Sequence, residues 1–512
     1  MTKIPLQITG GSYQNPSRPA NYQRCVNMYS TTSGASDQLE VSNKLNQGRG
    51  GSVLLRTMGC SIIGNVNTVD INPTCRGLYQ IEVSAGNYIT IVIMGAKVYN
   101  LNFNSTDLTI NPVLLGSLQT VAGLVSVTSN TTQIMFICYD FLNILVGGSI
   151  YNYSAGTFSD ITDPNFVGGS TVAMIDDYFI YNQVGTQSFW FSNVNDGTTY
   201  NALNVAAKSG KPDNVVALGQ TKGELWVFGT DTVEVWYDAG NSPGSPFSKR
   251  IGSDLDIGCS AAFSIANVNG NLMWLDSRRF VAISDYSAFF RNQSTGYTIT
   301  KASTEAIDAE FASYSKVSDA IASTYNDNGH IMYEITFPTV KKTWVFDNTI
   351  NMWHEKSYYN TQENLADQAI TNFYVQNESY LLAASLNNNN IYVVSRDYLD
   401  DAGQAIHRIR TTQHYNNAFN NIGVDQLELK CDCGKAPLTI TNPMISMRYS
   451  NDSGYTWSSF LPRTLGNTGQ YGTRITWNCL GSAHEWLFEF TISDPIDFSI
   501  LDGVADVNVG SV

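Results

Sequence analysis

Residues 210–247 read GKPDNVVALGQTKGELWVFGTDTVEVWYDAGNSPGSPF. They contain three short runs rich in aromatic and β-branched residues, at 214–218, 224–229 and 233–238, with turn residues between them. The same order of run, turn and run follows in residues 261–284. A unit of this kind cannot bury both of its faces alone, so repeated units must stack against one another. The pattern predicts a β-propeller.

The repeat extends well beyond this stretch. Seven units follow one another, with hairpin turns near Gly95, Gly147, Gly185, Asp231, Ser277, Thr339 and Asn388. From the first turn to the last the chain runs 293 residues in six steps, a mean of about 49, and a four-stranded blade takes about 40–50 residues. We therefore predict an all-β chain with a propeller of about seven blades in residues 75–400, or six if the first two hairpins merge.

The segments on either side of the repeat have a different pattern. Residues 1–74 carry few periodic runs and are predicted to form an N-terminal arm or ring-closing segment. Within them, residues 21–29 read as one strand, either an arm that reaches a neighbouring subunit or, as we favour, the strand that closes the ring beside the last blade. Residues 405–512 contain five stretches of alternating apolar and polar residues, which predict a small C-terminal β-sandwich.

One helix is predicted, in the longest gap between blades. Thr304 can cap it, and Ile307, Phe311 and Tyr314 follow on one face of a helix. We expect it to pack on the rim of the propeller as a structural element.

Composition limits the functions that are open to the chain. The 512 residues include 29 Lys and Arg against 44 Asp and Glu, a net charge of −15, and only 14% are charged. A protein that grips DNA needs a basic patch, so the charge argues against DNA binding, although the chain could surround DNA without holding it. There is no run of about 18 apolar residues, so no membrane span is predicted, and the first residues lack the apolar core of a signal peptide.

The residues that could bind a metal or carry out catalysis are scattered. The eight Cys are dispersed except for Cys431 and Cys433, and the five His are far apart. A zinc site would show paired Cys elements or Cys with His at close spacing. We predict no metal, no cofactor, and buried or half-buried free thiols of a protein that folds in a reducing cytosol. The common nucleophile and phosphate-loop motifs are absent, so no catalytic residue is predicted.

Residues 450–457 read SNDSGYTW and fit the S-x-D-x-G-x-T-W pattern of an Asp-box. Such a turn uses its Gly for a left-handed backbone, its Asp to bind turn amides, and its Trp for packing. We predict a structural turn made by Ser450, Asp452, Gly454, Thr456 and Trp457. Sialidases carry several of these turns, so a glycan-binding or glycan-hydrolysing propeller that recognises the host surface is the alternative. The converging Arg residues and the Tyr–Glu pair of a sialidase are not visible here.

Two blocks of sequence resemble a known family. Residues 210–250, followed by Gly258-Cys259 and by STEAI at 303–307, are similar to the packaged-DNA stabilization proteins of short-tailed bacteriophages. The C-terminal part is similar to tail proteins of the same group, through MRYSNDSGYTWS at 447–458, TRITW at 473–477 and FEFTISDP at 488–495. The resemblance covers residues 75–510. In this chain Asn478, Cys479 and residues 484–486 stand where the family usually has more Arg, so contacts made by those Arg are expected to differ.

The resemblance implies a structural virion protein without an active site. It would be the tail hub, or nozzle, that closes the DNA-filled head below the portal and adaptor and forms part of the ejection channel. The implied partners are further copies of the chain in a cyclic ring, a hexamer; the head–tail adaptor and portal ring; the tail needle, fibre or tailspike proteins; and duplex DNA that passes through the lumen without specific binding. The implied location is the virion tail, assembled in the cytoplasm of the bacterial host.

A cellular propeller scaffold is a further alternative. Such a scaffold would be stable as a monomer, whereas a tail hub would form a ring with its adaptor.

Overall fold

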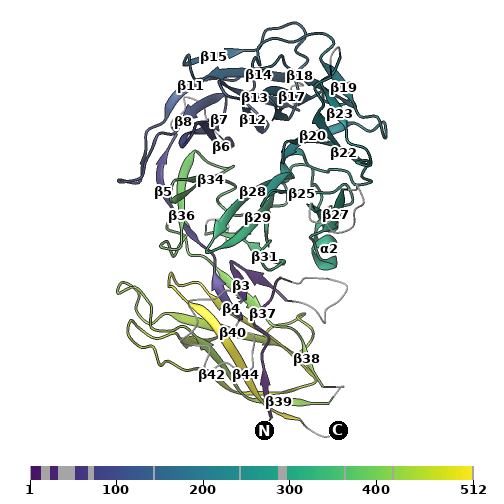
Figure 1. The fold of residues 1–512 in the computed structure, drawn as a ribbon. Helices are drawn as coiled ribbons and strands as arrows, with labels where there is room; N and C mark the ends of the chain where they lie inside the picture. The colour runs from purple at the N-terminus through teal and green to yellow at the C-terminus, as the bar shows by residue number, and fades with distance from the viewer. Residues whose placement is uncertain are drawn as a thin grey trace.

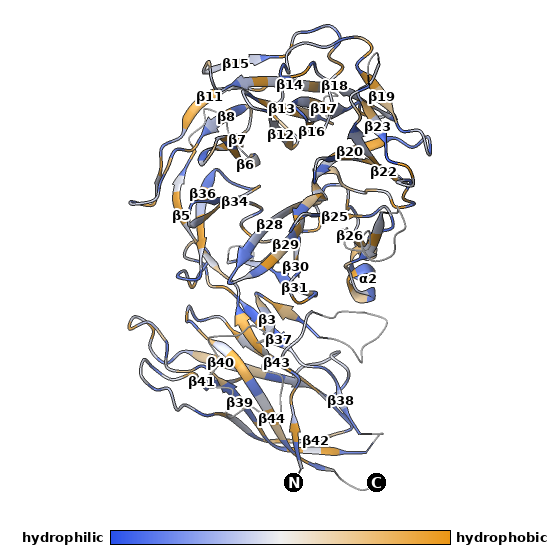
Figure 2. Ribbon diagram, viewed as in Figure 1, coloured by the Kyte–Doolittle hydropathy of each residue, from blue (hydrophilic) through white to orange (hydrophobic). Residues whose placement is uncertain are grey.

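The structure is a computed structural model that describes residues 2–12, 23–32, 52–66, 74–141, 145–241, 244–285, 297–361, 365–417 and 420–509. It has two parts, a ring of small sheets and, below it in Figure 1, a pair of packed sheets that holds both chain ends. Hydrophobic residues are interspersed with hydrophilic ones along the strands of both parts (Figure 2), as expected for sheets that bury at least one face.

The ring is a propeller of seven four-stranded antiparallel sheets, which confirms the predicted fold. Blades one to three are formed by β6 (Cys75–Ser84), β7 (Asn87–Met94), β8 (Lys97–Asn100) and β11 (Val113–Ser117); β12 (Val125–Ser129), β13 (Gln133–Asp140), β14 (Leu145–Asn152) and β15 (Thr157–Asp160); and β16 (Val172–Ile175), β17 (Tyr178–Asn182), β18 (Ser188–Phe191) and β19 (Val205–Ala207). Blades four and five are formed by β20 (Val215–Thr221), β21 (Glu224–Gly229), β22 (Val233–Asp238) and β23 (Phe247–Lys249); and β24 (Ala266–Val268), β25 (Asn271–Leu275), β26 (Val281–Asp285) and β27 (Thr298–Lys301).

Blades six and seven complete the ring. They are formed by β28 (Ile321–Asp327), β29 (His330–Phe337), β30 (Lys342–Asp347) and β31 (Met352–Lys356); and by β34 (Phe373–Asn377), β35 (Tyr380–Ala384), β36 (Asn390–Ser395) and β5 (Gly59–Asn65). The innermost strand of blade one, β6, contacts both β12 of blade two and β34 of blade seven, so the ring is closed. Two hairpins, β9 (Phe103–Asn104) with β10 (Thr109–Ile110) and β32 (Tyr358–Asn360) with β33 (Leu365–Asp367), lie outside the blades.

The first two strands of several blades are joined by two-residue turns with left-handed backbone at both positions. Blade four has Lys222 (φ 52°) and Gly223 (φ 75°), and blade five has Asn269 (φ 53°) and Gly270 (φ 79°). Turns of this hand match the twist of the flanking strands. The sequence marked both as turns, whereas the spacing of the blades was predicted from the turns between second and third strands, such as those at Asp231 and Ser277.

The strand that closes the ring is not the predicted one. We favoured residues 21–29, whereas β5 (Gly59–Asn65) pairs with β36 as the fourth strand of blade seven. This strand reads GCSIIGN and has Gly near both ends, so it gives a weak strand signal. Blade seven therefore contains strands from both halves of the chain, and its backbone hydrogen bonds tie residues 59–65 to residues 390–395.

Neighbouring blades pack face to face through large side chains. Trp226 of blade four and Trp274 of blade five are both fully buried, with ring centroids 6.3 Å apart, and Phe228 meets Trp274 edge-on at 5.1 Å. The predicted helix is α2 (Glu305–Ser313), and the hydroxyl of Thr304 accepts a hydrogen bond from the Ile307 amide as its cap. Its Ile307 and Phe311 are buried between blades five and six, so the helix packs against the propeller.

The second part is a β-sandwich, as predicted. One sheet contains β1 (Thr2–Pro5), β3 (Met28–Thr32), β4 (Ser52–Arg56), β44 (Ser499–Val509), β39 (Ile422–Cys431) and β42 (Ile475–Ala483). The other contains β37 (Arg408–Thr411), β43 (Glu485–Ile492), β40 (Met444–Ser450) and β41 (Leu461–Thr464), with β38 (Tyr415–Asn416) paired to β43. Trp477 and Phe490 come from opposite sheets, and both are buried in the core between them.

A two-residue strand connects the propeller to the sandwich. Val26 of β2 (Cys25–Val26) pairs in parallel with Glu355 of blade six. Both Cys25 and Val26 pair antiparallel with β37 of the sandwich. The result is one continuous sheet of ten strands. Nine of them follow one another from β28 of blade six to β41 of the sandwich, and the tenth, β38, pairs with β43. The N-terminal segment is thus neither one arm nor one blade strand, because β5 joins the propeller, β1, β3 and β4 join the sandwich, and β2 bridges the two.

Candidate functional site

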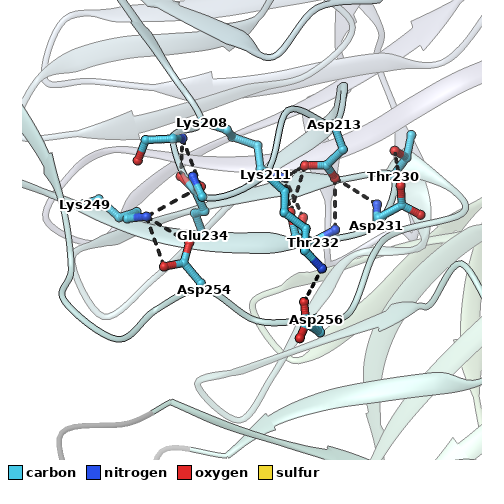
Figure 3. A network of polar contacts seen from close by, with 12 residues as sticks. Lys208, Lys211, Asp213, Thr230, Asp231, Thr232, Glu234, Lys249, Asp254 and Asp256 are labelled. Carbon is cyan, nitrogen blue, oxygen red and sulfur yellow. Dashed lines mark hydrogen bonds and ion pairs between the residues drawn. The ribbon is translucent and has the colours of Figure 1, made fainter.

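The stretch that predicts the fold also contributes most of the labelled residues of the polar network in Figure 3. It lies where the segment between β19 and β20 meets the β21–β22 turn of blade four. Asp213 accepts hydrogen bonds from the amides of Asp231 (2.9 Å) and Thr232 (3.0 Å), and from the Thr232 hydroxyl (2.8 Å). One carboxylate therefore fixes the turn and the incoming segment together.

Lys208 enters this network from the other side and is completely buried at its side chain. Its Nζ lies 2.6 Å from Asp213 Oδ1 and donates to the carbonyl and the hydroxyl of Thr232, each at 2.8 Å. An ammonium group has three protons, and these three partners use all of them. Burial raises the pKa of Asp213, but the hydrogen bonds from Lys208 and the turn outweigh it, so the pKa lies below its usual range.

Glu234 holds the same connection from blade four. Its carboxylate accepts from the amides of Ser209 (3.1 Å) and Gly210 (2.6 Å) and from the indole of Trp236 (3.0 Å). The side chain of Glu234 is fully buried. Asp213 and Glu234 of the signature in 210–250 are thus occupied with structural hydrogen bonds, and the network joins blade three to blade four.

The Asp-box forms the turn that follows β40. The Asp452 carboxylate accepts from the Thr456 amide at 2.8 Å, the Thr456 hydroxyl at 2.6 Å and the Ser450 hydroxyl at 2.7 Å. The Gly454 amide donates to Ser450 Oγ at 2.9 Å, and Gly454 has a φ of 90°, in the left-handed region. The Trp457 indole donates to the Gly454 carbonyl at 3.1 Å. The structure brings all five predicted residues together in one turn.

The electrostatics of this turn favour a charged Asp452. Hydrogen bonds from Thr456, then from Ser450, lower the pKa of Asp452 to about 2. A general acid would need the opposite shift. Arg448 lies over the Trp457 ring, 4.7 Å from its centroid, so the indole also carries a cation–π contact.

A buried histidine cluster lies where the N-terminal segment meets blade six, and no pattern in the sequence indicated it. His330 Nδ1 is 2.5 Å from Asp347 Oδ2, and His330 Nε2 is 3.2 Å from the Thr31 hydroxyl. Tyr29 packs edge-on to His330 at 5.1 Å and stacks on His354 at 5.8 Å. Burial lowers the pKa of His354 to about 3, which keeps it neutral. Because Thr31 and His330 are 299 residues apart, spacing could not have revealed the contact.

The cysteines agree in most respects with expectation. Among the described residues no group of three or more His, Cys, Asp or Glu is arranged to hold a metal. All eight Cys are free; seven are buried or half-buried, whereas Cys479 is exposed, contrary to prediction. Burial raises the pKa of Cys75 and of Cys259 to about 12, so both remain thiols. In the described ranges there is no helix long and apolar enough to cross a membrane.

Two family models match the chain, one on each domain. Residues 92–398 match the family described as "Bacteriophage P22 Gp10, beta-propeller", and residues 407–508 match "Bacteriophage P22 Gp10, beta-sandwich". The fold and these matches define the class: a structural protein of a phage tail. The chain belongs to the Bacteriophage P22 Gp10 family, which is the packaged-DNA stabilization, or tail hub, family of short-tailed phages that the sequence resembles.

Comparison with other proteins adds little. No curated protein matches the sequence. Among solved structures, the computationally designed Ika8 protein aligns with 68% of this chain and 93% of its own at 10% identity and a TM-score of 0.34. The N-terminal domain of Nup159 aligns with 66% and 95% at 8% identity and a TM-score of 0.40. The extracellular domain of BT4673, a putative hybrid two-component system from B. thetaiotaomicron, aligns with 84% and 58% at 8% identity and a TM-score of 0.41. Scores this low carry no argument.

The blade-four network predicts a strong difference between two lysines. Lys208→Met leaves Asp213 without its buried cation and should destabilise the propeller by about 3 kcal/mol, in the range for breaking a buried ion pair. Lys211→Met is the matched control, since Lys211 pairs with Asp256 on the surface, and it should change stability little. Urea unfolding of both variants measures the difference. Equal effects would show that the network does not hold blade four.

The Asp-box predicts a pH-dependent contribution to stability. The pKa of Asp452 is lower in the folded state, about 2, than the usual 3.8, so its charge stabilises the fold above pH 3.8, and this contribution is lost as the pH falls through 2. Asp452→Asn should therefore unfold at a lower temperature than the wild type at pH 7, with the gap closing towards pH 2. Thermal unfolding followed by circular dichroism checks this. A gap that stays constant down to pH 2 would contradict the ionised turn.

Proposed function

We propose that this chain is the tail hub, or nozzle, that closes the DNA-filled head below the portal and adaptor and forms part of the ejection channel. Membership of the family, with both of its domains present in order, is the observation that carries the proposal. In this role the protein works through fit and symmetry and carries out no reaction. The hydrogen bonding of Asp213, Glu234 and Asp452 supports this, because their carboxylates are occupied by neighbouring donors.

The distribution of charge supports a channel that does not hold DNA. Residues 75–400 contain 30 acidic and 16 basic residues, a net charge of −14, which is nearly all of the −15 of the chain. Residues 98–207 contain no Lys, Arg or His, although 110 residues at the average of the chain would contain about six Lys and Arg. Duplex DNA is bound chiefly through basic side chains that displace its counterions. Blades one to three would therefore let DNA pass along them without retaining it.

The proposed assembly is a closed homohexamer, coaxial with the portal. A tail that continues a ring-shaped portal most simply uses a cyclic oligomer, whose subunits meet through two different faces. The head–tail adaptor would lie above this ring, and the needle, fibre or tailspike proteins would attach to it. Low surface charge and many Tyr and Asn suit such contacts, because Tyr buries area at small entropic cost.

The rigid connection between the domains supports a mechanical role. The ten-stranded sheet joins blade six to the sandwich through β2, so force applied to one domain reaches the other through backbone hydrogen bonds. A host-surface glycan-hydrolysing propeller, the alternative function, would instead need two carboxyl groups free to act on a sugar. Asp452 of the Asp-box does not meet this requirement.

The isolated protein should show negligible affinity for duplex DNA at physiological salt, because the channel repels phosphate. The double variant Asp107→Lys/Asp160→Lys places two Lys at exposed positions within residues 98–207, which contain no basic residue. It should gain weak, salt-sensitive binding to duplex DNA and serves as the positive control. Phage particles made without the chain should package DNA and then lose it. Tight binding by the wild type would contradict the non-gripping channel, and full, stable heads in its absence would contradict the closure role.

A further inference from the structure

A groove with a volume of about 440 Å³ lies on the sandwich, on the outer face of the sheet that contains β1, β44, β39 and β42. These strands lie below the propeller in Figure 1. The loop of residues 471–474 forms one wall, and residues of β1, β39 and β44 form the floor. The volume falls in the range of about 300–1,000 Å³ that is usual for small-molecule sites.

The register of the sheet places planar polar groups in a row across the floor. Asp506 of β44 pairs with Lys3 of β1 on one side and with Gln426 of β39 on the other, and Gln426 pairs with Asn478 of β42. Residues that are directly opposite in neighbouring strands point to the same face. The Gln426 amide donates to Asn478 Oδ1 at 3.0 Å, so this part of the floor is held in place.

A second row is fixed in the same way. Glu428 lies opposite Val504, and Arg474 donates two hydrogen bonds to its carboxylate, both 2.8 Å long. A bidentate pair of this kind has little rotational freedom. The floor is therefore preorganised before any ligand arrives.

Two residues of the lining are placed to contact a ligand. Asp506 is half-buried and lines the groove, where a carboxylate can accept hydrogen bonds; its Oδ1 atom is buried and closed to a ligand. Tyr471 lines the groove with 70% of its surface exposed and offers an aromatic surface for packing.

The charge of the lining selects the kind of ligand. Its charged residues are Lys3, Lys430, Arg474, Glu428, Asp502 and Asp506. Three positive and three negative charges balance, so the lining favours neither an anion such as phosphate nor a basic peptide. A neutral ligand with many hydroxyl groups and an apolar face meets the conditions, since its hydroxyls both donate and accept.

We infer that this groove is a binding site for a neutral carbohydrate, in which a sugar ring packs against Tyr471 and one of its hydroxyls donates to Asp506. The site is on the sandwich, and the inference does not depend on the role of the chain in closing the head. It gives the tail a contact with neutral glycans, such as those of a cell surface, without any hydrolysis.

The test is an array of bacterial glycans, neutral and acidic, probed with the full-length protein, followed by titration calorimetry with the neutral glycan that gives the strongest signal. Wild-type protein should bind at least one neutral glycan. Tyr471→Ala and Asp506→Asn should each weaken binding about tenfold or more. Tyr455→Ala is the matched control, because Tyr455 is 80% exposed and lies outside the groove, and it should bind as the wild type does.

Each other outcome overturns the inference. Circular dichroism first establishes that the variants are folded, which is expected because Tyr471 is exposed. Binding of no neutral glycan, a preference for acidic glycans, or equal binding by the wild type and both groove variants would each contradict the site. If the variants lose only an association with another tail protein, then a protein partner occupies the groove. Failure here leaves the DNA-retention test unaffected, so the two proposals can be judged separately.

Discussion

The structure depends on the way one short backbone segment, Cys25–Val26, is shared between two domains. Val26 pairs with blade six on one side and with β37 of the sandwich on the other, so neither neighbouring edge is left open at this point. An unpaired strand edge can pair with another chain and so promote aggregation, whereas a paired edge cannot. Asn27, which follows, has a left-handed φ of 54°. Its side-chain amide donates to the carbonyls of Ser357 (2.9 Å) and His407 (2.8 Å), which lie on opposite sides of the junction.

Charged groups strengthen this junction from both sides. Arg24 lies 3.2 Å from Glu355 of blade six, and Lys342 lies 2.9 Å from the same carboxylate. Burial raises the pKa of Glu355, but the two cations outweigh it and keep the carboxylate ionised. Arg410 is completely buried and donates to the Gly11 carbonyl at 3.1 Å, but its Nε and Nη2 atoms have no partner among the described residues, so it adds no ion pair to the junction. Breaking a buried ion pair is costly, so the Arg24–Glu355 contact helps to hold the N-terminal segment to blade six.

Local signals in the sequence were sufficient to predict most of the fold. Two-residue turns such as Lys222-Gly223 and Asn269-Gly270 mark hairpins that form between neighbouring residues, and the cap at Thr304 marks α2. The Asp-box was predicted for the same reason, because its hydrogen bonds span four residues or fewer. The outer strands of the blades were missed because they are short, as β19 (Val205–Ala207) is, and follow at irregular distances. The hairpin turn predicted near Gly147 is wrong, because Gly147 lies inside the strand β14 (Leu145–Asn152) and pairs with Cys138.

Contacts between distant residues could not be predicted. The pairing of β5 with β36 joins residues more than 300 positions apart, and no periodic pattern in the sequence indicates this pairing. The same holds for Thr31 with His330, and for the groove, whose rows exist only once the register of β1, β44, β39 and β42 is known. The signature acids Asp213 and Glu234 were visible in the sequence, but their hydrogen bonds to the connection between blades were not.

The most direct test of this account is differential scanning calorimetry of the wild type and of Asn27→Ala. The variant loses four hydrogen bonds of one buried side chain, which donates to Ser357 O, Ser357 Oγ and His407 O and accepts from the Ser357 amide, at a cost of about 1–3 kcal/mol for the groups left unpaired. Asn201→Ala, at an exposed position of the propeller, is the control. The account predicts one transition for the wild type and the control, and two separate transitions, propeller and sandwich, for Asn27→Ala. Two independent transitions in the wild type would contradict the claim that the junction makes the chain a single body.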